Sequence, residues 1–191
     1  MSLDDRLNQI IPRLEDPAFL ANQGIGNEIG FYVFDYPPED ELKVRAHVAL
    51  IRRHFEKTGT IRIVEINLFD VLLDILKGKK VLDKVLLSEL QWPPQKLKSN
   101  LAPLTRVENV VNEIVRQVGQ NHDIVFLTGV GSAFPLIRGH EVLNNLHDKL
   151  DRKPLVLFYP GKYTMQELVL FGILEANYYR AFRLVPDART T

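Results

Sequence analysis

The glycine-containing segment TGVGSAFP, Thr128 to Pro135, is the first part of this sequence that could carry chemistry. It follows an apolar stretch that we expect to be a strand, and ligands of open α/β sheets bind beyond the carboxyl ends of the strands. Glycines would let backbone amides approach an anion, but a tight turn from strand to helix needs glycine for steric reasons alone. Both interpretations stay open. The candidate anion-binding residues are Thr128, Gly129, Gly131 and Ser132.

No nucleotide-binding or nucleophile motif is complete. Gly161 and Lys162 follow an apolar stretch as the end of a phosphate loop would, but Val156 occupies the position of the first glycine. The segment GIGNEIG, Gly24 to Gly30, precedes a predicted strand instead of following one, so it is not a dinucleotide fingerprint. Ser132 lacks the G-x-S-x-G context of a nucleophilic serine. We therefore predict no catalytic residue, no enzyme activity and no cofactor.

Metal ligands are not indicated either. Zinc sites need three or four ligands, usually including close pairs, whereas the histidines of the predicted helices are seven residues apart. We expect them to be surface or hydrogen-bonded residues. Asp35 and Glu65 lie at or near predicted strand ends, where paired carboxylates could hold magnesium, although acids there are also common as helix caps. The histidines are His47 and His54, and His140 and His147.

The composition describes an ordinary globular chain with one basic region. Of 191 residues 46% are apolar and 25% are charged, and 24 basic side chains balance 24 acidic ones. A net charge of zero disfavours general DNA binding, which draws its affinity from phosphate neutralisation. Residues 77–106 are basic against only Asp83 and Glu89, which indicates either a solvated face or a site for an acidic partner. The candidate basic patch comprises Lys77, Lys79, Lys80, Lys84, Lys96 and Lys98.

The cellular location is indicated by the lack of cysteine, of a signal peptide pattern and of a long apolar run. The chain has no cysteine, which excludes disulfides and thiolate chemistry and fits a reducing cytoplasm. Its first residues are acidic where a signal peptide would be basic, and no apolar run reaches the length of a membrane span. We expect a soluble cytoplasmic protein.

Apolar runs alternate with helical patterns along the chain. Continuously apolar strands separated by helices predict an α/β fold with a mostly parallel sheet of about five strands, Rossmann-like or P-loop-like without a Walker motif. We expect a single domain over residues 1–191, in which residues 1–28 form a helix and a loop. Capping boxes at Thr105 with Glu108 and at Thr164 with Glu167 predict two helix starts, and the prolines of QWPPQKLKSN predict a loop. The predicted strands are residues 29–34, 60–66, 124–128, 154–159 and 178–185, and a further helix is predicted over residues 136–150.

Five stretches resemble the characteristic blocks of the BrxB family of bacteriophage-exclusion (BREX) systems, in the same order. They are FYVFDYPPEDELKVR from Phe31, VEINLFDVLLDIL from Val64, FLTGVGSAFPLIRGHEVLNNL from Phe126, PLVLFYPGKY from Pro154 and NYYRAFRL from Asn177. The resemblance implies a bacterial protein of phage defence and of the DNA methylation that marks self. It implies neighbours: a PglZ-type protein of the alkaline phosphatase superfamily, an adenine methyltransferase and a large BrxC-type ATPase.

The function that this resemblance implies is a non-catalytic assembly subunit that pairs with the PglZ-type protein. Arginine can make bidentate contacts to a partner's carboxylates, and the segment after Gly129 is rich in groups that a helix does not need for packing. Two alternatives are a degenerate nucleotide-binding regulator using the turn at Thr128, and a DNA-contacting adaptor using the basic patch, with weak or no DNA binding by the isolated chain. The candidate partner-binding residues are Ser132, Arg138, His140, Glu141, Asn144 and Asn145.

Overall fold

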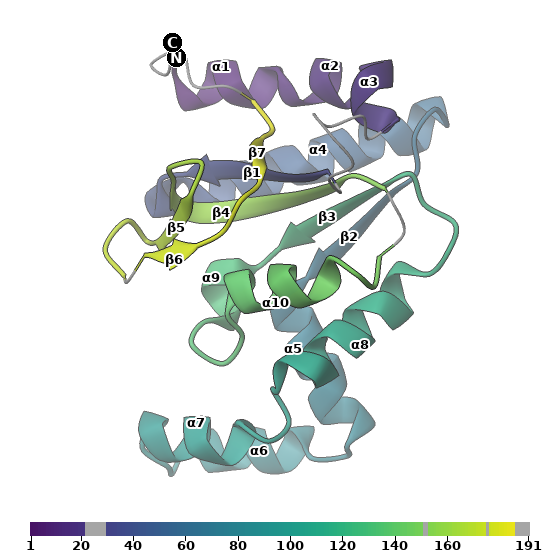
Figure 1. Cartoon of the computed structure of the whole chain (residues 1–191). Helices are drawn as coiled ribbons and strands as arrows, with labels where there is room; N and C mark the ends of the chain where they lie inside the picture. The colour runs from purple at the N-terminus through teal and green to yellow at the C-terminus, as the bar shows by residue number, and fades with distance from the viewer. Residues whose placement is uncertain (22–29, 151–152, 175, 186–191) are drawn as a thin grey trace.

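The computed structural model describes the chain except residues 22–29, 151–152, 175 and 186–191 (Figure 1). Its centre is a sheet in the order β2-β3-β4-β1-β7, in which all neighbouring pairs are parallel. Strands β5 and β6 continue it as an antiparallel ribbon from the end of β4. The predicted α/β fold with a mostly parallel sheet is confirmed. The strands are β1 (Phe31–Tyr36), β2 (Ile63–Asn67), β3 (Ile124–Thr128), β4 (Leu155–Tyr163), β5 (Glu167–Leu170), β6 (Asn177–Tyr178) and β7 (Phe182–Arg183).

Helices cover both faces of this sheet (Figure 1). Side chains alternate between the faces of a strand, so Tyr32 and Phe34 pack with α1 to α4 whereas Phe31 and Val33 pack with α5, α8 and α10. Two apolar layers explain why the strands are apolar throughout. The helices are α1 (Leu3–Asn8), α2 (Ile10–Leu14), α3 (Pro17–Leu20), the 3-10 helix η1 (Pro38–Asp40), α4 (Glu41–Thr58), α5 (Leu68–Gly78), α6 (Leu82–Glu89), α7 (Pro94–Leu101), α8 (Val107–Val118), α9 (Val130–Ala133) and α10 (Gly139–Leu146). Within the described chain, no helix has the length and apolar composition needed to cross a membrane.

The capping box predicted at Thr105 lies within one residue of a helix start but does not cap it, and the helix start predicted at Thr164 is wrong. Helix α8 begins at Val107 after Arg106, and the Thr105 hydroxyl instead donates to a carbonyl of the preceding helix, that of Leu101, at 3.2 Å. The Thr164 hydroxyl does accept from the Glu167 N–H at 3.1 Å, but the Thr164 N–H also donates to the Glu167 carbonyl at 3.1 Å. This pairing closes the turn between β4 and β5, because a hydroxyl that can cap a helix can equally satisfy a turn.

Several predicted boundaries also differ. The loop predicted around Pro93 and Pro94 contains α7, because proline, which ends one helix, is well suited to the first position of the next. The helix predicted over residues 136–150 is shorter, as α10, and a one-turn helix, α9, precedes it. The predicted last strand is divided into β6 and β7. Residue 29 of the first predicted strand, and GIGNEIG except Gly30, lie outside the described residues.

Candidate functional site

The turn after β3 uses its glycines for close packing. Gly129 has a φ of +71°, and a Cβ atom there would lie 2.1 Å from Asn67 Oδ1. A Cβ on Gly131 would lie 3.0 Å from the ring of Phe171. The Thr128 hydroxyl donates to the Glu65 carboxylate at 2.9 Å. These contacts favour the steric interpretation of the turn, since its glycines and the Thr128 hydroxyl serve the protein's own packing.

A pocket of about 200 Å³ lies beside this turn. Two of the predicted partner-binding residues, Arg138 and His140, line it together with Tyr159 of β4. Tyr159 is paired with Asp35 near the carboxyl end of the parallel ladder between β4 and β1. The pocket therefore lies where ligands of parallel α/β sheets bind. Its lining residues differ from the predicted anion-binding residues of the turn.

The polar groups of this pocket have few partners. The Tyr159 side chain is 4% exposed, its hydroxyl has no hydrogen-bond partner among the described residues, and burial raises its pKa. Arg138 is exposed, and its guanidinium forms no hydrogen bond or ion pair within the described chain. The His140 side chain is 19% exposed, and burial lowers its pKa; Glu141 opposes this shift and Arg138 adds to it. His140 is therefore neutral at neutral pH.

The remaining predicted partner-binding residues lie on the outer side of the same region. Ser132 is exposed on α9, and Glu141, Asn144 and Asn145 are exposed on α10. The Asn145 amide donates to the Glu141 carbonyl within the helix at 2.8 Å. The five predicted residues other than half-buried His140 are exposed on α9, on α10 and on the link between them, and we call these five the surface over α9 and α10.

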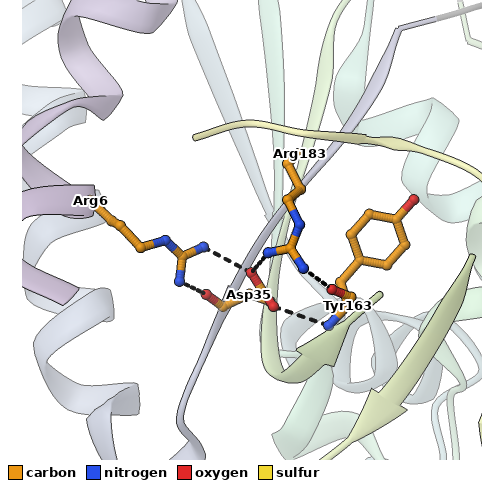
Figure 2. A network of polar contacts seen from close by, with 4 residues as sticks. All are labelled: Arg6, Asp35, Tyr163 and Arg183. Carbon is orange, nitrogen blue, oxygen red and sulfur yellow. Dashed lines mark hydrogen bonds and ion pairs between the residues drawn. The ribbon is translucent and has the colours of Figure 1, made fainter. Parts of the chain in front are cut away.

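The strand-end carboxylates are held by arginines. Asp35 Oδ1 lies 2.8 Å from Arg6 Nη2 and 3.2 Å from Arg183 Nη1, and Asp35 Oδ2 accepts the Tyr163 N–H at 3.0 Å (Figure 2). Glu65 pairs with Arg52 at 2.8 Å. Two arginines already neutralise Asp35, so the arrangement fits a structural role better than a magnesium site.

The four histidines of the predicted helices are not grouped at one site, and the fifth, His122, is buried. His47 Nε2 lies 3.0 Å from the Leu7 carbonyl oxygen, and His54 Nε2 lies 3.6 Å from the Glu15 carboxylate. Across the residues that the structure describes, no three His, Cys, Asp or Glu side chains are grouped as metal ligands would be.

The glycine–lysine pair of the incomplete phosphate loop lies inside β4. A Cβ atom on Gly161 would lie 2.2 Å from the Val169 carbonyl oxygen, so glycine is needed where the antiparallel ribbon closes. Lys162 is exposed. The spacing resembles a phosphate loop only because a close strand contact also requires glycine.

The basic patch lies on the end of α5, on the turn that follows it, and on a pair of helices, α6 and α7, that we call the α6–α7 arm (residues 82–101). Figure 1 shows the arm at the end of the molecule away from the sheet. Leu101 is its one buried residue among those of the two helices. Lys77 pairs with Asp74 at 3.2 Å, and Lys96 Nζ lies 4.8 Å from the centre of the Trp92 ring. Lys79, Lys80, Lys84 and Lys98 are exposed.

Three leucines of the same part of the chain are also exposed, and no motif in the sequence indicated them. Leu86, Leu87 and Leu90 are 48%, 65% and 85% exposed. Their spacing places them on one side of α6, because residues three and four apart are neighbours on a helix. The sequence of α6 could have indicated this exposure, because α6 has more apolar residues than one packed face of a helix requires.

Comparison with known proteins identifies the family. The family model described as "BREX protein BrxB" matches residues 64–184. A BREX protein BrxB of Bacillus cereus (strain H3081.97) is 43% identical over 187 residues, which cover 96% of this chain and 97% of that protein. One of Escherichia coli O9:H4 (strain HS) is 41% identical over 187 residues, covering 97% and 92%. No solved structure matches significantly. This chain therefore belongs to the BrxB family and takes part in BREX phage defence.

Proposed function

We propose that this chain is a non-catalytic, cytoplasmic assembly subunit of a BREX complex that binds a PglZ-type protein. The observation that carries the proposal is the group of exposed leucines on α6 and at its C-cap. Contiguous exposed apolar side chains rimmed by polar ones mark surfaces that bind other proteins. Leu86, Leu87 and Leu90 with the lysines around them have this composition.

The charges around the leucines favour an acidic partner surface. The basic patch comprises lysines of the arm and of the residues just before it, whereas the acids of α6 are Asp83 and Glu89. Complementary charges guide association and suppress unsuitable partners. We therefore expect the partner to present apolar side chains within an acidic surface.

The exposed surface over α9 and α10 is our second candidate contact with the same partner. Arg138 has no partner within the described chain, so its guanidinium is available for a carboxylate of another protein. Helix α10 covers the same face of the sheet as α5, and the arm follows α5 in the chain (Figure 1). A single partner could contact both surfaces.

Co-purification of this chain with the PglZ-type protein of its own BREX system tests the proposal. The wild-type chain should retain the partner, and the triple variant Leu86→Ser, Leu87→Ser, Leu90→Ser should lose it. The matched control is the double variant Leu42→Ser, Leu50→Ser, because these leucines are 76% and 53% exposed on α4. The control should retain the partner, and both variants should keep the wild-type melting temperature.

Three results would contradict this assignment. If the triple variant binds the partner as tightly as the wild type does, the arm is not the contact. If both variants lose binding equally, replacing any exposed leucines weakens binding, and the loss does not identify the arm as the contact. If the wild-type chain retains no PglZ-type protein, the partner is wrong, and retention of another BREX subunit would show which protein replaces it.

The exposed lysines also support a second candidate, a DNA-contacting adaptor. DNA affinity should then fall steeply with salt, because lysines release counterions from phosphates. We expect only weak binding to duplex DNA by the isolated chain at physiological salt. Sub-micromolar binding that is lost when Lys79, Lys80 and Lys84 are changed to glutamate would favour the adaptor.

A further inference from the structure

We propose that the pocket beside α10 binds a small monocarboxylate with a short apolar chain. The pocket is lined by residues of α9, of the link from α9 to α10, of the start of α10 and of β4, together with Leu170, Leu174 and Asn177. This inference is independent of partner binding, because it concerns the isolated chain. Three features of the pocket carry it: an unpaired buried hydroxyl, an uncapped helix start and an apolar wall.

The buried hydroxyl belongs to Tyr159. The side chain is 4% exposed and lines the pocket, and its hydroxyl has no partner among the described residues. Leaving a buried donor unsatisfied is unfavourable, because the group has lost its hydrogen bonds to water. The oxygen keeps some accessible surface, and Tyr159 lines the pocket. A ligand oxygen there would accept the hydrogen bond that the protein does not.

The helix start belongs to α10, an eight-residue helix whose first two residues, Gly139 and His140, line the pocket. The first N–H groups of a helix have no acceptor inside it. No side chain caps α10, because the N-cap residue Arg138 makes no such bond. The free N–H groups and the helix dipole favour an anion, and the unpaired guanidinium of Arg138 can bind a carboxylate through two hydrogen bonds.

The size and charge of the site select the ligand. Its volume of about 200 Å³ is below the roughly 300–1,000 Å³ of common ligand pockets, so only a few carbon atoms fit. Phe134, Leu170 and Leu174 form an apolar wall for them. Among the described residues that line the pocket, Arg138 is the single cation at neutral pH, and the Glu141 carboxylate lies 3.9 Å from His140 Nε2. One negative charge is therefore favoured over the two of a phosphate.

Nuclear magnetic resonance of the ¹⁵N-labelled full chain tests this site with three probes: butyrate, acetate and inorganic phosphate. The titrations are run at neutral pH and constant ionic strength. Butyrate should shift the amide signals of Gly139 and His140 in a saturable way, and more tightly than acetate or phosphate. Arg138→Gln should weaken butyrate binding at least tenfold. Tyr159→Phe, which removes one hydroxyl, should weaken it about threefold or more.

The control variant is Arg62→Gln, because Arg62 lines a different cavity together with Asp123 and Lys153. It should leave butyrate binding unchanged. Equal affinities for acetate and butyrate, shifts that never saturate, or equal losses in Arg62→Gln and Arg138→Gln would each overturn the proposal. If Arg138→Gln disturbs the fold, an unchanged affinity in Tyr159→Phe overturns it instead. The partner is absent throughout, so neither result depends on the proposed assembly function.

Discussion

Arg6 Nη2 lies 2.8 Å from Asp35 Oδ1, so that the first helix is tied to the sheet by a buried ion pair (Figure 2). A second guanidinium, that of Arg183, lies 3.2 Å from the same oxygen and brings in β7, from the other end of the described chain. Arg6 Nη1 also donates to the Asp35 carbonyl at 2.8 Å. One carboxylate therefore connects three segments that are far apart in the sequence.

Asp35→Asn should strongly destabilise the protein. It removes the negative charge between two arginines, and breaking a buried pair from one side costs about 3–5 kcal/mol because the other charge stays buried. Urea unfolding measures the change in unfolding free energy. The control is Asp4→Asn, because Asp4 pairs with Lys43 at 2.7 Å but both side chains are exposed. We expect the control to cost about 1 kcal/mol or less; equal costs would mean that the buried network is not stabilising.

A glycine-to-alanine pair separates backbone strain from a steric clash. Gly59 and Gly129 both have left-handed φ values, +66° and +71°, but a Cβ on Gly59 would meet nothing within 4 Å. Gly59→Ala should therefore cost only the left-handed strain, about 1–2 kcal/mol. Gly129→Ala should cost about 0.5–2 kcal/mol more, since its Cβ would displace Asn67 Oδ1, which caps α5 by accepting the Phe69 N–H at 2.9 Å. Thermal unfolding of both variants measures the difference, and identical costs would contradict this role for Asn67.

The parallel sheet could be predicted because its strands are apolar on both faces. A continuously apolar run can be recognised within the strand's own sequence, without knowledge of its distant contacts. The ribbon of β5 and β6 could not. The spacing of Thr164 and Glu167 is the same in a turn and in a helix start, and pairing with the end of β4 decides between them. Helix α7 was missed for a similar reason, because Pro94 fits both a loop and the first turn of a helix.

The pocket could be predicted only in part. Arg138 and His140 are close in the sequence, so one segment already contains both. Tyr159 belongs to β4, and only the packing of the strand against α9 and α10 brings its hydroxyl to them. The exposure of Leu86 and Leu87 depends on what α7 covers, which spacing along α6 cannot reveal.

Acid should destabilise the protein through His140. Burial lowers the folded-state pKa of His140, whereas the unfolded value is about 6.5. The unfolded chain then binds more protons, so this contribution to stability is complete above about pH 6.5 and is lost as the pH falls through the folded pKa. His140→Gln should reduce this part of the acid dependence in urea unfolding.

A histidine titration by nuclear magnetic resonance checks the cause directly. Arg138→Gln should raise the pKa of His140, because Arg138 lowers it, and Glu141→Gln should lower the pKa further, because Glu141 raises it. Opposite shifts in the two variants are expected. Shifts of the same sign would mean that changes of conformation, and not these two charges, control the histidine.

The last prediction is that Arg138→Glu folds normally but binds the PglZ-type partner at least tenfold more weakly, a loss of about 1.4 kcal/mol. Folding should tolerate the change because the Arg138 guanidinium has no partner in the described chain. A carboxylate at a helix start is also favourable to the dipole, so the melting temperature should hardly move. Binding should weaken because the change reverses the charge offered to an acidic partner.

Arg53→Glu on α4 is the matched charge reversal for this experiment, since Arg53 is exposed and α4 covers the other face of the sheet. Affinities of both variants for the purified partner, with melting curves of each, separate a local contact from a general effect of charge. A tenfold loss in Arg138→Glu alone supports the surface over α9 and α10. Equal losses in both variants would indicate long-range charge attraction instead. Full binding by a folded Arg138→Glu protein would remove this surface from the interface and leave the α6–α7 arm as the remaining candidate.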